Sequence, residues 1–283
     1  MLRTGLFDWI PAFAGMTSKS KVPKNSAPPI ALTIAGSDSG GGAGIQADLK
    51  TFHAHNVHGL SVIAAITSQN TRGVTAVHSV PIKHIRSQIE TVFDDFPIAA
   101  VKTGMLGNAA TVRLVAKELR KRKPAWLVVD PVMIATSGSR LLDEDAIDAM
   151  VNELIPLADV LTPNLPEAEA LLGQPLRAAK QMMQAGEALR ALGAQTVLLK
   201  GGHARGGEIV DRYFDERGLM EIRHARLPRE GHGTGCTLAS AIAAELANGH
   251  TPSSAIRRAT AYVHRALKQG YRPGGGPAYV LRH

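Results

Sequence analysis

Ile30-Ala-Leu-Thr-Ile-Ala35, followed by Gly36-Ser-Asp-Ser-Gly-Gly-Gly-Ala-Gly44, is the stretch that decides the fold of this chain. The apolar run is short, as in a strand that is buried on both faces. Residues 45–53 then carry apolar side chains at helical spacing, so the glycine-rich segment joins a strand to a helix. Glycines let the backbone of such a connection approach a ligand closely. We therefore predict a strand, a ligand-binding loop and a helix.

The same alternation continues along the chain. Further strands are predicted at residues 59–66, 74–80, 98–101, 126–129, 158–161 and 196–199, with residues 208–213 and 220–225 as an antiparallel pair. Helices are predicted at residues 45–53, 82–93, 108–120, 143–154, 167–172, 180–192, from 233 onward and at 253–269. Strands that alternate with helices in this way form a mostly parallel sheet covered on both faces. The prediction is a three-layer α/β/α domain that binds ligands at the carboxyl ends of its strands.

A second glycine-rich stretch, Glu230-Gly-His-Gly-Thr-Gly-Cys236, precedes a small-residue apolar helix. Gly233, Thr234 and Gly235 lie where the helix begins, so unpaired backbone N–H groups and the helix dipole favour a bound phosphate there. A helix N-terminus also lowers the pKa of a thiol, which makes Cys236 a catalytic candidate. The alternative is an ordinary turn and cap, with Cys236 as a small core residue.

Composition excludes several classes of protein. The chain has 283 residues, 45% of them hydrophobic, and no apolar run long enough to span a membrane. Its formal charge of +8 comes from scattered basic residues, and the cluster Arg120-Lys-Arg-Lys123 suits a solvated helix end, so we predict no nucleic-acid binding. Residues 1–29 lack the features of a signal peptide and are predicted to be a disordered extension of a domain at 30–283.

Other nucleotide-dependent and nucleophilic sites fit less well. Gly42-Ala-Gly-Ile-Gln-Ala47 satisfies a dinucleotide fingerprint, but the next strand ends in Thr67-Ser-Gln-Asn70, without the acidic residue that binds a ribose. A nicotinamide-dependent dehydrogenase is therefore the weaker hypothesis. The sequence has no Walker A motif, and Gly36-Ser-Asp-Ser-Gly40 has Asp38 where a hydrolase elbow needs serine.

Several segments together resemble one enzyme family. They are Ala31-Leu-Thr-Ile-Ala-Gly-Ser-Asp38, Gly41-Gly-Ala-Gly-Ile-Gln-Ala-Asp-Leu-Lys-Thr-Phe52, Gln69-Asn-Thr71, Lys102-Thr-Gly-Met-Leu106, Asp130-Pro-Val-Met133, Thr162-Pro-Asn-Leu-Pro-Glu-Ala168, Lys200-Gly-Gly-His203 and His232-Gly-Thr-Gly-Cys-Thr237. In this order they resemble the hydroxymethylpyrimidine/phosphomethylpyrimidine kinases of thiamine biosynthesis, which are ribokinase-like. The resemblance covers roughly residues 30–280. It implies a ribokinase-like fold for the domain.

The resemblance also implies a pyrimidine site. Gln69 takes the position of the family's glutamine that hydrogen-bonds the aminopyrimidine, a task that suits a carboxamide because it both donates and accepts. Gly36, Asp48, Met105 and Val132 fall where the family lines the pocket. For Met105 and Val132, plain core packing is an equally open interpretation.

On the nucleotide side, the resemblance implies ATP and Mg²⁺. Asn164 and Glu167 match a segment associated with magnesium and phosphates, and Lys200 matches a lysine that neutralises ATP phosphates. Asp130 is a second magnesium-side carboxylate, with capping of a turn as its alternative role. Our hypothesis is that the Cys236 thiolate helps to deprotonate the substrate hydroxymethyl group while the N–H groups of residues 233–236 hold the phosphoryl group.

The activity implied is ATP-dependent phosphorylation of 4-amino-5-hydroxymethyl-2-methylpyrimidine and then of its monophosphate, by a cytoplasmic homodimer. Gly40 stands where many relatives have serine, and Thr67-Ser68 precedes the pyrimidine-binding glutamine. These departures keep a pyridoxal or pyridoxine kinase open as an alternative. A non-catalytic pyrimidine-binding regulator is a further alternative, although Cys236 and Lys200 are both retained.

Overall fold

The computed structural model describes residues 27–133, 141–176, 179–202 and 206–283. The predicted N-terminal extension, residues 1–29, lies outside this described part except for its last three residues. Among the described residues, no helix is both long and apolar enough to cross a bilayer.

One nine-stranded sheet forms the centre of the molecule, in the order β3-β2-β1-β4-β5-β6-β7-β8-β9. Its strands are β1 (Ile30–Asp38), β2 (His58–Asn70), β3 (Gly73–Ser79), β4 (Ile98–Thr103), β5 (Leu127–Val129), β6 (Val160–Leu161), β7 (Thr196–Leu199), β8 (Glu208–Asp215) and β9 (Gly218–Ala225). The strands from β2 to β7 in this order pair in parallel, whereas β3, β8 and β9 add antiparallel edges. The predicted mostly parallel sheet, with its antiparallel pair at residues 208–225, is confirmed.

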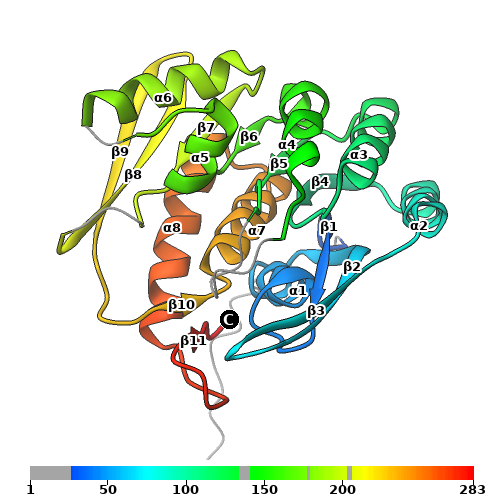
Figure 1. Ribbon diagram of the computed structural model, residues 1–283, viewed down its shortest axis with the longest axis horizontal. Helices are drawn as coiled ribbons and strands as arrows, with labels where there is room; N and C mark the ends of the chain where they lie inside the picture. Colours follow the sequence, from blue (N-terminus) through cyan, green and yellow to red (C-terminus); the bar gives the residue numbers. More distant parts are fainter. Residues whose placement is uncertain (1–26, 134–140, 177–178, 203–205) are drawn as a thin grey trace, which may run out of the picture.

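Helices cover both faces of the sheet (Figure 1). They are α1 (Gly44–Ala54), α2 (Ile82–Asp95), α3 (Ala109–Arg122), α4 (Glu144–Ala149), α5 (Leu165–Leu172), α6 (Ala179–Ala191), α7 (Thr234–Ala247) and α8 (Pro252–Lys268). Leu32 and Ile34 of β1 belong to one apolar cluster and Ala31 to the other, as the two-residue period of a strand requires. The two clusters separate three layers, so the predicted α/β/α architecture is confirmed.

Helix ends agree with the sequence in part. Asn108 caps α3, because its side chain accepts a hydrogen bond of 2.9 Å from the Thr111 N–H. Asp143 occupies the N-cap position of α4 but makes no side-chain capping bond there. The predicted helix at 143–154 is also not uniform, since α4 continues as a π-helical turn, Met150–Leu154.

The C-terminal end adds an element that the sequence did not indicate. Strand β10 (Gly231–His232) pairs in parallel with β11 (Tyr279–Val280), outside the main sheet. In Figure 1 this red C-terminal segment lies beside β10, near the hairpin of β2 and β3. The segment that precedes α7 is therefore paired with the C-terminal end of the domain.

The strand order reverses direction between β1 and β4, because β2 lies on one side of β1 and β4 on the other. Open α/β sheets bind ligands at such a switch point, beyond the carboxyl ends of the strands. The glycine-rich segment after β1 begins at this edge of the sheet. The fold thus predicts where a functional site is placed.

Candidate functional site

The turn before α7 is the centre of the site. Gly233 is the N-cap residue, with a φ of 81°, and a side chain there would collide with the Gly42 carbonyl oxygen. This close approach packs the glycine-rich loop after β1 against the start of α7. The N–H groups of residues 234–236 have no carbonyl partner within the helix, as in any first turn. Unpaired N–H groups of this kind, together with the helix dipole, are a common setting for a bound anion.

Cys236 lies in this first turn, but its chemistry differs from the prediction. The residue is half-buried, and burial raises the pKa of its thiol to about 11. Lys102 and the Gly44 N–H act to lower this pKa, whereas Asp48 and Asp130 raise it further. The expectation of a thiol with a lowered pKa is therefore wrong, because desolvation outweighs the helix terminus. In this structure Cys236 is a neutral thiol at pH 7.

Three predicted nucleotide-side residues come together next to the turn. Asp130 follows β5, Glu167 lies in the first turn of α5, and Lys200 follows β7. Lys200 Nζ lies 2.9 Å from Asp130 Oδ1 and 3.6 Å from Glu167 Oε2. A methyl group placed on Gly235 would lie 3.4 Å from Lys200 Nζ, which puts this cluster against the turn before α7.

The cluster has perturbed acid-base properties. Burial raises the pKa of Glu167 to about 7, with Lys200 opposing the shift and Asp130 adding to it. Burial alone would lower the pKa of Lys200, but the charges of the two carboxylates raise it above its ordinary value. Lys200 therefore stays cationic, as a partner for phosphate oxygens must.

Asn164 has a local structural role in the same cluster. Its side chain accepts from the Glu167 N–H at 2.9 Å, and its own N–H donates to Glu167 Oε2 at 2.7 Å. This reciprocal pair is a capping box, which fixes the start of α5 and the direction of the Glu167 carboxylate.

The carboxylates fit a magnesium ion shared with a nucleotide. Asp130 Oδ2 is buried and has no hydrogen-bond partner among the described residues. No group of three or more His, Cys, Asp or Glu side chains in the described part could hold a metal ion without help. Mg²⁺ commonly binds through one or two carboxylates together with water and substrate phosphates. Asp130 and Glu167 are the residues that would hold it.

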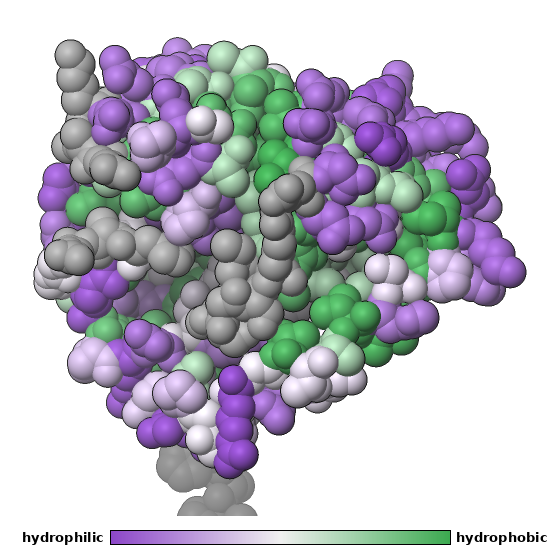
Figure 2. Space-filling model, viewed as in Figure 1, coloured by the Kyte–Doolittle hydropathy of each residue, from purple (hydrophilic) through white to green (hydrophobic). Residues whose placement is uncertain are grey.

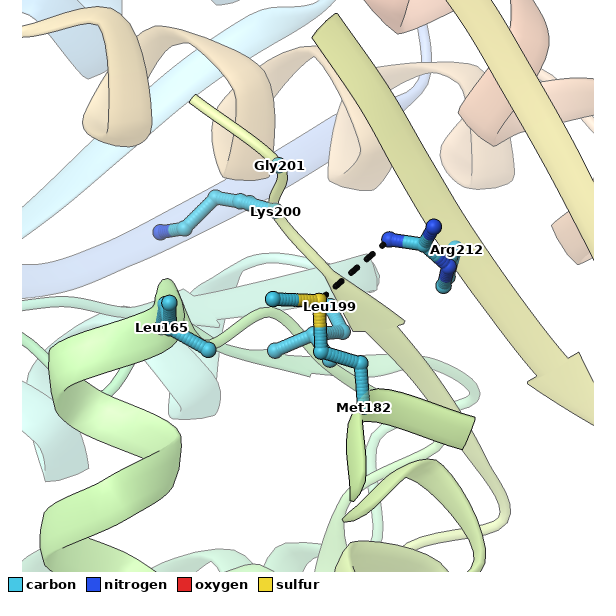
Figure 3. A pocket seen from close by; sticks show the side chains of 6 residues that line it. All are labelled: Leu165, Met182, Leu199, Lys200, Gly201 and Arg212. Carbon is cyan, nitrogen blue, oxygen red and sulfur yellow. Dashed lines mark hydrogen bonds between the residues drawn. The ribbon is translucent and has the colours of Figure 1, made fainter. Parts of the chain in front are cut away.

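A small apolar hollow adjoins this cluster. Figure 3 shows Leu165, Met182 and Leu199 around it, with Lys200 extending away from Arg212. Arg212 donates to Met182 Sδ across 3.8 Å, which closes one side of the hollow. Beside the end of β7, the site is thus bordered by the cationic Lys200 and by the apolar side chains around the hollow.

Gln69 lies on the other side of the turn, at the end of β2. Its amide nitrogen lies 3.2 Å from His232 Nε2, and His232 directly precedes Gly233. The same His232 nitrogen lies 3.0 Å from Asp38 Oδ2. The structure therefore brings the early carboxamide and the late glycine turn together, as the sequence predicted.

The remaining pocket residues fall into two groups. Met105 is buried against Gly36, where an added methyl group would lie 3.3 Å from the Met105 sulfur. Val132 is half-buried, and its N–H donates to the Asp130 carbonyl. Met105 and Gly36 therefore lie together at the end of β1, whereas Val132 belongs to the Asp130 side.

Asp48 is a predicted pocket residue that the structure does not bring to the surface. Its side chain is fully buried and accepts hydrogen bonds from Thr33, Lys102 and Ser240 at 2.6 to 3.1 Å. Burial would lower the pKa of Lys102, but the charge of Asp48 raises it. A ligand cannot touch a carboxylate that has no accessible surface. In this structure Asp48 therefore contacts only buried protein groups beneath the site.

Comparison with known proteins agrees with this geometry. Residues 38–280 match the family model described as phosphomethylpyrimidine kinase. The chain belongs to the phosphomethylpyrimidine kinase family.

Individual relatives of this family cover nearly the whole chain. A hydroxymethylpyrimidine/phosphomethylpyrimidine kinase of Rhizobium meliloti is 49% identical over 88% of this chain and 96% of its own length. The hydroxymethylpyrimidine/phosphomethylpyrimidine kinase of Haemophilus influenzae is 47% identical over 87% of this chain and 93% of its own length. A crystal structure of phosphomethylpyrimidine kinase from Clostridium difficile is 44% identical, with a TM-score of 0.76 over 84% of this chain and 99% of that one.

Solved pyridoxal kinases are also similar to this phosphomethylpyrimidine kinase family member. The ADP complex of the Bacillus subtilis pyridoxal kinase is 35% identical, with a TM-score of 0.84 over 90% of this chain and 97% of that chain. The ribokinase-like fold that the sequence resemblance implied is confirmed by these neighbours.

Sequence reasoning gave no role to three residues of this family member. Lys102, Asp38 and His232 stood inside quoted motifs, but only the structure shows what they contact. For Lys102 a signal existed, because a cation that continues the apolar strand at 98–101 needs a buried partner. The partner of His232 is 194 positions away in the chain, so no local pattern indicates it.

Proposed function

We propose that this chain transfers the γ-phosphoryl group of ATP to the hydroxymethyl group of 4-amino-5-hydroxymethyl-2-methylpyrimidine. In a second step it phosphorylates the resulting monophosphate, giving the diphosphate used in thiamine biosynthesis. One observation carries the proposal: Gln69, the Gly233 turn and the Asp130–Lys200 cluster meet at one edge of the sheet. An aminopyrimidine edge and a polyphosphate can each find a complementary partner there.

The residues divide the chemistry between them. The N–H groups of residues 234–236 and Lys200 face the place where negative charge develops on the transferring group. A bound Mg²⁺ would neutralise phosphate charge next to Asp130 and Glu167. Because burial raises the pKa of Cys236 to about 11, its thiol is a poor general base at pH 7. Phosphoryl transfer passes through a loose transition state, so positioning and electrostatics supply most of the rate.

A coupled assay of ATP consumption tests this function. Hydroxymethylpyrimidine, its monophosphate, pyridoxal and ribose are offered separately, with Mg²⁺ present. We expect turnover of both pyrimidines and a loss of at least about a hundredfold in kcat for Lys200→Met, since a lost charge contact costs several kcal/mol in a buried site. Tight binding of the pyrimidine without ATP turnover would instead identify a regulator.

Pyridoxal phosphorylation is a second candidate activity. It is favoured by the likeness to solved pyridoxal kinases, including a Staphylococcus aureus enzyme in complex with AMP-PCP and pyridoxal, at 34% identity and a TM-score of 0.84. Parallel kcat/KM values for pyridoxal and hydroxymethylpyrimidine decide which substrate is preferred. A larger kcat/KM for pyridoxal than for hydroxymethylpyrimidine would identify the chain as a vitamin B6 kinase.

We also propose that the chain acts as a cytoplasmic homodimer. Val77 of the edge strand β3 is 46% exposed, and Ile66 of β2 is 51% exposed on the opposite face of the same hairpin. Figure 2 shows apolar surface over this region at lower right. An apolar patch beside an edge strand suits pairing with a second copy. Sedimentation should give about twice the chain mass, and Val77→Lys should shift it toward the monomer.

A further inference from the structure

We propose that His232, held by Asp38, fixes the orientation of the Gln69 amide and thereby selects a 4-aminopyrimidine over its 4-oxo analogue. This inference rests on the proposed function and names a positioning residue for substrate choice. His232 is not a group that reacts. It acts through the carboxamide that meets the ring.

Asp38 is an anion in this structure. It is buried, and its carboxylate accepts the N–H groups of Gly40, Gly42 and Ala43 at 2.8 to 3.0 Å. Burial alone would raise the pKa of Asp38, but the contacts with His232 and with the N–H groups of Ala43 and Gly40 lower it below its ordinary value. An ionised carboxylate only accepts hydrogen bonds.

The charge of Asp38 determines where the proton of His232 lies. His232 Nε2 is 3.0 Å from Asp38 Oδ2, and a nitrogen lone pair at that distance would repel the anion. His232 Nε2 must therefore carry a hydrogen. The imidazole ring is held in place, since an added methyl group on Gly42 would lie 2.5 Å from its Cδ2 atom.

The protonated nitrogen in turn dictates the Gln69 amide. The end of the amide that faces His232 Nε2 lies 3.2 Å away, so a nitrogen there would set two donors against each other. A half-turn of the amide places its oxygen there instead. Such half-turns are decided by the surrounding hydrogen bonds.

Thr67 favours the same half-turn from the other side. Its hydroxyl oxygen lies 3.1 Å from the second end of the Gln69 amide and 2.9 Å from the Ser37 carbonyl oxygen. The single hydroxyl hydrogen is taken by Ser37, since a carbonyl can only accept. A lone pair of Thr67 then accepts from the amide nitrogen, and the single N–H of His232 Nε2 is shared between Asp38 and the amide oxygen.

The fixed amide presents one pattern to a ligand. An acceptor lone pair faces out on the His232 side and an N–H donor on the Thr67 side. A 4-aminopyrimidine offers an amine donor beside a ring-nitrogen acceptor, which matches. The 4-oxo analogue offers the reverse order, so binding it would require the amide orientation that Asp38 and His232 oppose. Bidentate readout of this kind discriminates by about tenfold to a hundredfold.

Two variants test the selection. His232→Phe keeps a ring over Gly42 but removes the N–H, and Thr67→Val removes the acceptor on the other side. We expect each to lower the kcat/KM preference for hydroxymethylpyrimidine over 5-hydroxymethyl-2-methylpyrimidin-4-one by about tenfold or more, chiefly through KM. His55→Phe is the matched control, because His55 faces Glu245 away from the site, and its preference should equal that of the wild type.

A loss of kcat with an unchanged preference in His232→Phe would overturn the proposal, since it would show that His232 only supports the Gly233 turn. A second measurement does not depend on the substrate. Nitrogen-15 NMR of the unliganded wild-type chain should show His232 protonated at Nε2. A ring protonated at Nδ1 alone would overturn the proposal even if the kinase activity is present. Conversely, Nε2 protonation without pyrimidine turnover would refute only the proposed function.

Discussion

At the scale of single residues, Cys236 shows how two electrostatic effects compete. Its place in the first turn of α7 favours a thiolate, and Lys102 acts in the same direction. Burial and the neighbouring carboxylates act against it and prevail, since they raise the pKa to about 11. The loss of hydration of a charged sulfur thus outweighs partial charges at the helix end.

This balance predicts the reactivity of the thiol. Because Cys236 is the single cysteine of the chain, iodoacetamide labelling reports on it alone. The thiolate fraction of a group with a pKa of about 11 grows about tenfold per pH unit below that value. We expect the labelling rate, followed by intact mass, to rise in this way from pH 7 to pH 10. A plateau near pH 8 would contradict the raised pKa; Cys236→Ala gives the background.

At the scale of elements, one buried ion pair and its hydrogen bonds link two central strands of the sheet to two helices. Asp48 of α1 contacts Lys102 of β4, Thr33 of β1 and Ser240 of α7. These donors satisfy the hydrogen-bonding capacity of a carboxylate that has no access to water. The pair therefore sets the position of α1 and α7, whose N-termini border the glycine turn.

Lys102→Met should destabilise the fold by about 3–5 kcal/mol, because it leaves a buried carboxylate without its counter-charge. Urea unfolding followed by circular dichroism measures the change. Adding Asp48→Asn to that variant should restore at least about half of the loss, since an amide oxygen still accepts from Thr33 and Ser240. Lys83→Met, on the exposed side of α2, should change stability by less than about 0.5 kcal/mol. Equal effects at Lys102 and Lys83 would refute the role of the pair.

The elements also show what the sequence could predict. Strands such as β1 and β7 are predictable because both of their faces are buried and their sequences are mainly apolar. Strand β10 and its partner β11 are two residues each and depend on a pairing across the whole domain. Their pattern carries no period to detect.

The features of the site also divide into those that the sequence indicates and those that it does not. Gln69, Lys200 and Glu167 could be named from motifs, and the structure brings them to the predicted edge of the sheet. The raised pKa of Cys236 and the buried position of Asp48 depend on packing between distant segments. Such solvation effects are tertiary, so neither spacing nor resemblance reveals them.

At the scale of the whole molecule, the end of the chain packs beside Gln69 and His232. The Gly276 N–H donates to the Thr71 hydroxyl at 3.0 Å, just beyond Gln69, and β11 pairs with the strand that carries His232. The C-terminal segment therefore contacts the turn that follows Gln69 and the strand that carries His232. It thereby links the early hairpin to the late turn.

Gly276→Ala tests that arrangement, because a methyl group there would collide with the Thr71 carbonyl oxygen and lift the segment from the hairpin. We expect KM for hydroxymethylpyrimidine to rise roughly tenfold, since a shift of about 1 Å at a positioning contact has effects of this size or larger. KM for ATP should stay nearly unchanged, because the Lys200 cluster has no contact with this segment among the described residues. Gly207→Ala, where an added methyl group meets nothing within 4 Å, is the control. Parallel increases in both KM values would show that the segment supports the fold as a whole rather than the pyrimidine side alone.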